Sequence, residues 1–159
     1  MGCKNIMSGL LEKVKFKDCS NWSVSHLLGS QFNYNQDYEL VRIGDFLTRN
    51  RDRIDIKDTV EYTRVKIKIN NNGVFVRDKV MGKDIGTKKQ FLIKEGQFLL
   101  SKIDARNGAF GLATNEVDNA IITADFFAYE IDKSKIESYF LVLMTTIKKF
   151  KEFAQGASS

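Results

Sequence analysis

The sequence is short of several residue types that often carry structure or chemistry. It contains no proline among 159 residues, two cysteines, Cys3 and Cys19, and a single histidine, His26. Turns must therefore be formed by glycine, asparagine and aspartate, and no proline-rich linker marks a domain boundary. The cysteines lack metal-ligand spacing, which favours free thiols, and the isolated histidine gives a metal site or a Ser-His triad little support.

Long apolar segments are also lacking. No run of about 18 apolar residues is present, so we expect no membrane-spanning helix. No secretory signal follows the first residues, and free thiols fit a reducing compartment. We therefore expect a cytoplasmic protein with no membrane partner, and the chain length favours one folded domain.

Positive charge is present in excess, and it is concentrated in the middle of the chain. The formal net charge is +5. Between Arg42 and Arg106, sixteen basic residues face nine acidic ones, whereas the flanking segments carry net charges of zero and −2. A basic region on a neutral body is expected of a nucleic-acid-binding protein. A solvated surface with chance clustering is an equally good interpretation of the charge alone.

The first part of the chain gives weak signals. We expect residues 1–37 to form a lightly helical lead-in with short helices. The next segment, 38–50, reads as a strand that turns into a short helix at Gly44, with Phe46 and Leu47 pointing inward. The charged stretch that starts at Arg49 reads as a loop or a frayed helix end.

The clearest strand signal is the stretch "YTRVKIKINNNG". Period two places Val65, Ile67 and Ile69 on the core side and Arg64, Lys66 and Lys68 on the opposite face. The asparagines and the glycine predict a tight hairpin turn, followed by a return strand. Acidic neighbours or a phosphate backbone could each relieve the repulsion among the three cations.

The last third of the chain predicts one long strand and one helix. The stretch "NAIITADFFAYEI" is apolar on both faces and indicates a central strand covered on two sides. A capping box formed by Ser134 and Glu137 predicts the start of an amphipathic C-terminal helix, which Gly156 can end. Its apolar stripe is expected to belong to the core, and it comprises Ile136, Phe140, Leu143, Ile147, Phe150 and Ala154.

A polar turn lies inside the stretch "LLSKIDARNGAFGLAT". Asn107 and Gly108 suffice for a hairpin turn, so the crowding of further charges around them suggests binding. Arg can bind the guanine edge and Asn the adenine edge in the major groove, and both Lys and Arg neutralise phosphates. The candidate DNA-binding residues are Arg49, Arg51, Arg53, Arg64, Lys66, Lys68, Lys83, Lys88, Lys89, Lys102, Arg106 and Asn107.

Catalytic chemistry has little support. A metal-dependent nuclease needs carboxylates and an amine that converge on Mg²⁺, and Asp125, Glu130 and Lys133 come nearest, with unsuitable spacing. No glycine-rich cofactor loop is present, and a proline-containing methyltransferase pocket is impossible. We therefore predict no catalytic residues, no metal site and no cofactor.

Several stretches occur in an order that resembles a known family: "YELVRIGDF", "GQFLLSKIDARNGAFGLAT", "NAIITADFFAYEID", "IESYFLVLM" and "FAQGASS". Together they are similar to a target recognition domain of the DNA specificity subunit of bacterial type I restriction-modification enzymes. The resemblance spans 38–159, which we take as a single domain. A full subunit of this family has two such domains separated by long helices, and the chain is expected to stop before the long helix.

The resemblance implies an α+β fold, in which a curved, mostly antiparallel sheet is accompanied by helices. It also implies that the domain binds double-stranded DNA and reads one half of a bipartite target. Catalysis would belong to partner subunits, namely an adenine methyltransferase that uses S-adenosylmethionine and an endonuclease. Two alternatives remain: a protein-interaction module with an incidental basic face, and, more distantly, a metal-dependent endonuclease.

Overall fold

The computed structural model describes residues 37–39 and 41–157, except for the side chains of residues 153 and 155–157. These residues belong to one unit that extends from Tyr34 to Ser159. The expected helices of the lead-in lie outside the described residues, so the lead-in and its boundary at residue 37 stay predictions.

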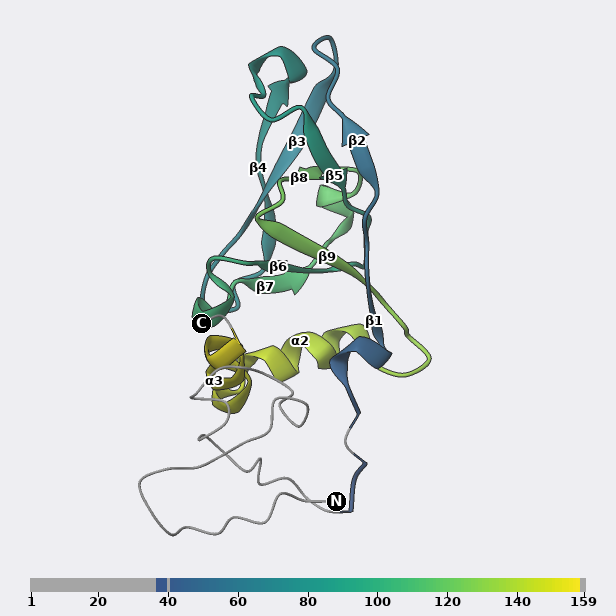
Figure 1. Cartoon of the computed structure of the whole chain (residues 1–159), viewed down its shortest axis with the longest axis vertical. Helices are drawn as coiled ribbons and strands as arrows, with labels where there is room; N and C mark the ends of the chain where they lie inside the picture. Colours follow the sequence, from purple (N-terminus) through teal and green to yellow (C-terminus); the bar gives the residue numbers. More distant parts are fainter. Residues whose placement is uncertain (1–36, 40, 158–159) are drawn as a thin grey trace, which may run out of the picture. The chain divides into compact units, whose positions relative to one another are not determined.

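Nine strands form two sheets in the described part of the chain (Figure 1). Sheet A has the order β1-β9-β6-β7, and all its neighbours are antiparallel. Its strands are β1 (Leu47–Arg49), β6 (Phe98–Ser101), β7 (Phe110–Leu112) and β9 (Phe126–Ile131).

Sheet B has the order β2-β5-β8-β3-β4, and only the β3–β8 pair is parallel. Its strands are β2 (Arg53–Asp55), β3 (Glu61–Ile67), β4 (Val74–Met81), β5 (Lys89–Leu92) and β8 (Ile121–Ile122). The predicted α+β class with mostly antiparallel strands is confirmed, and the strands are divided between two sheets.

The main core lies between the two sheets. Ile93 and Leu99 are fully buried there, together with Val117 from the short 3-10 turn η5 (Asn115–Val117). On the other face of sheet B, Ile121 packs with Tyr62 in a second apolar cluster. Sheet B is therefore covered on both faces at its central strand, as the apolar sequence of that strand predicts.

The single long strand expected over 119–131 is wrong in one respect, because a turn divides it into β8 and β9. At that turn the Thr123 hydroxyl accepts a hydrogen bond from the Asp125 backbone N–H and donates one to the Asp125 carboxylate. Such local side-chain bonds compete with the strand ladder. The chain therefore leaves sheet B after Ile122 and enters sheet A at Phe126.

Two helices, α2 (Ser138–Thr146) and α3 (Lys148–Ala157), cover the face of sheet A that points away from sheet B. Phe98 and Phe110 stack there with ring centroids 6.0 Å apart, and Phe150 of α3 meets Phe110 edge-on at 5.6 Å. Leu141 of α2 completes the buried part of this third cluster. Helices, sheet A and sheet B thus form successive layers.

The predicted start of the C-terminal helix at Ser134 is wrong, and the helix is broken once. The Ser134 hydroxyl donates to the Asp132 carboxylate, whereas the Glu137 side chain accepts the Phe140 backbone N–H and caps α2. Ile147 has an extended backbone, with φ −69° and ψ 144°, and separates α2 from α3. Lys148, Lys149 and Lys151 therefore lie in the first turn of α3, near a helix N-terminus.

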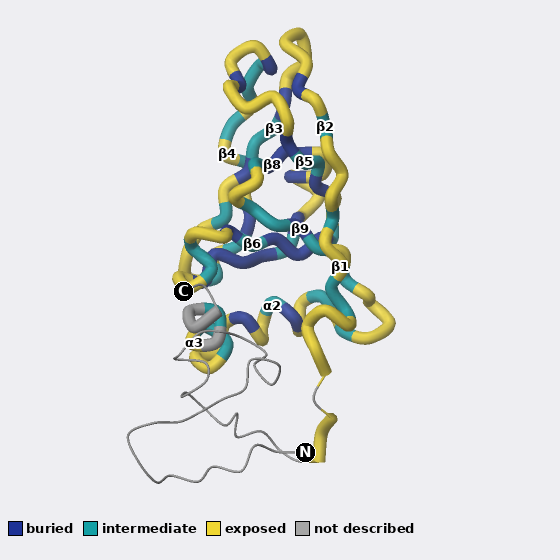
Figure 2. The backbone as a smooth tube through the Cα atoms, viewed as in Figure 1, coloured by how far each residue is buried: buried dark blue, intermediate teal, exposed yellow. Residues whose placement is uncertain are grey.

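The predicted core stripe is also wrong for three of its members. Phe140, Leu143 and Ile147 are 53%, 60% and 43% exposed, and Figure 2 shows exposed segments along α2. Leu141 and Thr145 point to the core instead. Because α2 is apolar almost all round, the 3.6-residue period does not identify the buried face. Ile136, Phe150 and Ala154 do pack against the core.

In the N-terminal part of the unit, the order of strand and helical turn is the reverse of the one expected. A 3-10 turn, η2 (Ile43–Asp45), comes first, and β1 follows it. The Asp45 carboxylate accepts the Arg42 backbone N–H, and the Asp45 N–H returns a bond to the Arg42 carbonyl. This closed pair of bonds stabilises a turn where we expected a strand. Phe46 and Leu47 are partly buried, as predicted.

The predicted β3–β4 hairpin is confirmed, and its turn packs against another turn. Asn70 and Asn71 adopt φ values of 59° and 58°. Their backbone N–H groups donate to the carbonyls of Asn107 and Gly108 at 2.8 and 2.7 Å. The Asn71 side chain also donates to the hydroxyl of Thr145, which is fully buried in α2. One turn therefore connects sheet B to the β6–β7 connection and to the helices.

Gly108→Ala tests this junction. Gly108 has φ +76°, and a Cβ at that position would lie 2.8 Å from the Asn71 side-chain oxygen. We expect a loss of about 1–3 kcal/mol in the free energy of unfolding, measured by urea denaturation. Gly86→Ala is the matched control, because a Cβ there meets nothing within 4 Å. An equal effect of both substitutions would contradict the close approach.

Candidate nucleic-acid interface

The structure distributes the predicted DNA-binding residues over four regions. Three lie along β1 and β2, three on β3 and its turn, three near the start of β5, and three on the β6–β7 connection. In that order they are Arg49, Arg51 and Arg53; Arg64, Lys66 and Lys68; Lys83, Lys88 and Lys89; and Lys102, Arg106 and Asn107. Some of these cations lie over an aromatic ring, some pair with a carboxylate, and others are exposed without an ionic partner in the described residues.

Arg49 and Lys102 are brought together around one aromatic ring. The Arg49 guanidinium carbon lies 3.9 Å from the centroid of the Phe127 ring, and the Lys102 Nζ lies 4.4 Å from the same centroid. Arg49 ends β1, Lys102 directly follows β6, and Phe127 lies on β9 between those strands. We call these three residues the Phe127 cluster. Neither cation pairs with a carboxylate of the described residues.

Arg64 is neutralised within the protein. Its Nε and one terminal nitrogen each donate to the Asp78 carboxylate at 2.7 Å, which is a bidentate ion pair across β3 and β4. The hydrogen bond from Arg64 holds the pKa of Asp78 below its ordinary value of 3.8. For Arg64, an acidic neighbour therefore relieves the charge repulsion that was expected among the cations of β3.

The other two cations of this region have no acidic partner among the described residues. Lys66 is exposed on the same strand. Lys68, just past the end of β3, places its Nζ 4.3 Å from the centroid of the Phe75 ring. Val65 and Ile67 are buried and half-buried on the opposite face, as predicted. Ile69 is 47% exposed, so the prediction that it faces the core is wrong.

The charged group of Lys88 is bound within the protein. Its Nζ donates to the Asp58 carboxylate and to the Gly82 carbonyl, each at 2.7 Å, and so joins the β2–β3 connection to η3 (Gly82–Asp84). Lys83 lies in η3, and only its backbone N–H takes part, in a bond to the Asp58 carbonyl. The Lys83 side chain is exposed and has no ionic partner in the described part of the chain.

Lys89, Arg51 and Arg53 are exposed, and none of them forms an ion pair within residues 37–39 and 41–157. Lys89 lies opposite Asp55 in the β2–β5 ladder. Arg53 lies opposite Phe91 in the same ladder, with its guanidinium carbon 5.9 Å from that ring's centroid. Arg53 is the first residue of β2, so the loop or frayed helix expected from Arg49 is wrong there.

The polar turn that connects β6 and β7 contains η4 (Ala105–Asn107). The Asn107 side-chain amide donates to the Asp104 carboxylate at 3.2 Å, and its backbone carbonyl accepts the Asn70 N–H. Arg106 is exposed and has no polar partner in the described residues. Asn107 therefore has a structural role in the turn, whereas Arg106 is available to a ligand.

The neutralising carboxylates and the central ring are not evident from the sequence. Asp78, Asp58 and Phe127 contact candidate cations, yet no local pattern marks them. The same holds for Arg77. It is the extra residue at a bulge where β4 shifts register against β3, and its Nε lies 3.6 Å from Asp78.

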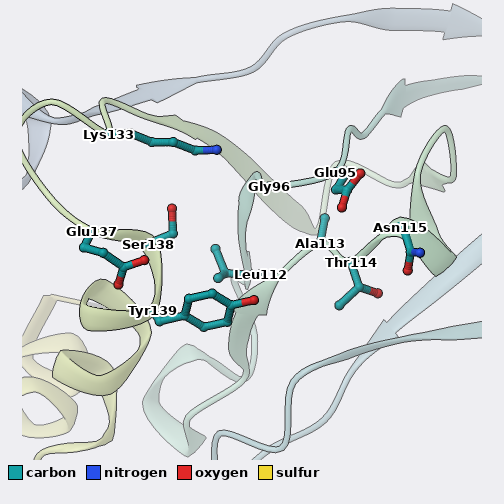
Figure 3. Close-up of a pocket in the computed structure, with 10 residues that line it drawn as sticks. All are labelled: Glu95, Gly96, Leu112, Ala113, Thr114, Asn115, Lys133, Glu137, Ser138 and Tyr139. Atoms are coloured by element: carbon teal, nitrogen blue, oxygen red, sulfur yellow. The ribbon is translucent and has the colours of Figure 1, made fainter.

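An open cleft of about 660 Å³ lies between the end of β7 and the start of α2 (Figure 3). In Figure 3, Lys133 and Glu137 lie on one side of the cleft, and Glu95 and Asn115 lie on the other. The mixture of acidic and basic side chains gives this cleft no selectivity for anions, and no candidate DNA-binding residue lines it. The full lining comprises Glu95, Gly96, Leu112, Ala113, Thr114, Asn115, Lys133, Glu137, Ser138 and Tyr139.

The three residues considered for a nuclease have separate contacts. Asp125 bonds to Thr123, Glu130 accepts from the buried Gln97, and Lys133 lines the cleft. Glu130 is exposed, contrary to the burial expected for its strand. The described residues contain no group of three or more histidine, cysteine or acidic side chains that could hold a metal ion. Among the described residues, neither helix has the length and hydrophobicity that a membrane span requires.

A comparison with protein families agrees with the order of motifs in the sequence. The family model of the type I restriction modification DNA specificity domain matches residues 35–159. Because this match covers most of the chain, the protein belongs to that family. A search of curated proteins found no match. The family resemblance is confirmed, and DNA target recognition in a restriction-modification system is the role that membership assigns to the domain.

The Arg64–Asp78 pair makes the stability depend on pH. Because the folded-state pKa of Asp78 lies below 3.8, the pair stabilises the fold above that value and loses its effect as the pH falls through the lower pKa. We expect Asp78→Asn to lower the free energy of unfolding at neutral pH and to match the wild type in strong acid. Urea denaturation over this pH range measures the difference.

Asp84→Asn is the control for this prediction, since Asp84 is exposed and has no ionic partner in the described residues. It removes one negative charge without breaking an ion pair. A deficit of Asp78→Asn that stayed constant into strong acid would show that the carboxylate charge is not the source of stability.

Proposed function

We propose that this domain recognises a specific sequence in double-stranded DNA and reads one half of a bipartite target. The membership in the DNA specificity family supports the recognition role. In this proposal the domain performs no catalysis, and it directs the methyltransferase and endonuclease subunits of a restriction-modification complex to their site.

The observation that carries the proposal is the excess of available positive charge. Among the candidate cations, only Arg64 and Lys88 are neutralised by carboxylates of the described residues. The remaining cations are exposed or lie over aromatic rings, so a DNA backbone can replace the counterions around them. Arg106 adds a guanidinium on a turn, where it is free to reach a base edge.

Selection from a random duplex pool, followed by sequencing, tests the proposal at low and at moderate salt. An enriched motif of a few contiguous base pairs supports half-site recognition. Salt-sensitive binding without any motif would contradict sequence recognition by this domain. Absence of binding even at low salt would favour the protein-interaction alternative.

Arg106→Ala tests base reading by the β6–β7 turn. We expect it to reduce discrimination at one position of the selected motif by about 1–3 kcal/mol, measured by titration of single-base variants of the motif. The control is Ile103→Ala in the same connection, because Ile103 is 66% exposed and uncharged. Unchanged discrimination in Arg106→Ala would exclude a base contact by this side chain.

A second observation favours assembly with a protein partner. Four large apolar residues of α2 and the residue that follows the helix are exposed, and we call these five the outer face of α2: Tyr139, Phe140, Leu143, Met144 and Ile147. A helix that is apolar on all sides is normally buried on all sides. We propose that the methyltransferase subunit contacts this face, in addition to DNA binding elsewhere.

Leu143→Glu tests the contact. We expect it to weaken binding to the methyltransferase subunit of the same system by at least about tenfold, because it places a charge in an apolar interface. Isothermal titration of the two purified proteins measures the affinity. Ile103→Glu is the control, since Ile103 lies outside α2 and is similarly exposed. Equal losses in both variants would contradict the assignment of this face.

A further inference from the structure

We propose that the Phe127 cluster is a binding site for one phosphodiester of the DNA backbone, and that it contributes affinity and orientation without reading sequence. The inference rests on the proposed function and assigns a role to two residues of sheet A and to Lys102, which directly follows β6. It divides the candidate DNA-binding residues into those that bind charge and those that are available to read bases.

The position of the cluster is fixed by backbone hydrogen bonds. Arg49 pairs with Tyr129 in the β1–β9 ladder, and Leu100 pairs with Phe127 in the β6–β9 ladder. The Lys102 backbone N–H donates to the Asp125 carbonyl at 2.9 Å, which holds Lys102 beside the start of β9. The backbone of both cations is therefore held in place before a ligand binds, so binding needs to order only their side chains.

Two like charges share one ring. Each cation approaches the centroid within the range at which an aromatic face attracts a cation. The two cationic groups can be no farther apart than the sum of their distances to that centroid. The ring holds them in place without cancelling their charge, so a bound anion relieves the mutual repulsion of the two cations.

Neighbouring groups leave the site positive. The Asp125 carboxylate accepts a hydrogen bond from the Thr123 hydroxyl, and it pairs with neither cation. Tyr129 lies next to the ring, with centroids 6.2 Å apart. Burial raises the pKa of Tyr129 above its ordinary value of 10.0, against the opposing effect of the Arg49 charge, so its hydroxyl adds no negative charge at neutral pH.

The cluster is suited to a phosphate and unsuited to a base. Bases bind aromatic residues by stacking on an open ring face. At Phe127 two cations already lie over the ring, and the adjacent Tyr129 ring meets it edge-on. The groups that the cluster presents to a ligand are thus cations. A phosphodiester carries the same negative charge whatever the DNA sequence, so this contact would not read bases.

The test compares Arg49→Gln, Lys102→Gln and Phe127→Leu with the wild type. Affinities are measured for the selected duplex and for an unrelated duplex over a series of salt concentrations. We expect each variant to lose about tenfold in affinity for both duplexes alike. The slope of log affinity against log salt concentration should fall by about 0.9 for each lost phosphate contact. Thermal melting of each variant verifies folding.

Two controls sharpen the comparison. Lys57→Gln removes one charge from the exposed β2–β3 connection, and we expect it to leave the salt slope near that of the wild type. Arg49→Lys keeps the charge over the ring and is expected to retain most of the binding. Inorganic phosphate, added at matched ionic strength, should displace the duplex no better than chloride.

The outcomes separate the two proposals. If the wild type binds DNA with a steep salt dependence and the cluster variants behave like Lys57→Gln, the site is rejected and DNA recognition stands. A change in sequence preference in Arg49→Gln or Lys102→Gln rejects a purely phosphate role. Specific displacement by inorganic phosphate assigns the site to a free anion. If the wild type binds neither duplex at low salt, both proposals are rejected.

Discussion

The contact between the β3–β4 turn and the β6–β7 turn is the constraint on which the rest of the unit depends. It joins sheet B to the connection that leads into the core of sheet A, and through Asn71 it also reaches the buried Thr145 of α2. Two backbone bonds at 2.7 and 2.8 Å require close approach of the chains, and Gly108 permits it because it has no Cβ. The β6–β7 turn also carries Arg106, so the backbone that presents this candidate DNA-contacting side chain is held by the junction of all three layers.

Sequence patterns correctly predicted those elements that depend only on residues close together in the chain. The period-two alternation of β3 and the asparagine-rich turn after it were sufficient for the hairpin, because both its register and its turn are encoded within 20 or so adjacent residues. The apolar stretch around Ile121 and Ile122 correctly indicated a strand covered on two faces. The buried face of the C-terminal helix was mispredicted. Because α2 has apolar residues on almost every side, its sequence period does not show which side faces the core.

The candidate site was only partly predictable, for a related physical reason. Sequence identifies cations, but the partner of each cation depends on strand register. Arg64 meets Asp78 because β3 and β4 pair in one particular register, with a bulge between Arg64 and Val65. Arg49 meets Phe127 because β1 pairs with β9, which is far away in the chain. Whether a cation is neutralised, placed over a ring or left exposed is therefore a tertiary property.

Contacts to phosphates and contacts to bases place different demands on a recognition domain of this kind. A phosphate contact must keep its position for every sequence. The β1–β9 ladder provides such a fixed position for Arg49, and the backbone bond to the Asp125 carbonyl provides one for Lys102. A base contact must change when the target changes, and a side chain on a turn changes with less disturbance to the core. Arg106 lies on such a turn, next to backbone groups that hold the turn itself. Phosphate binding by the Phe127 cluster and reading of bases by the η4 turn are thus compatible with one stable fold.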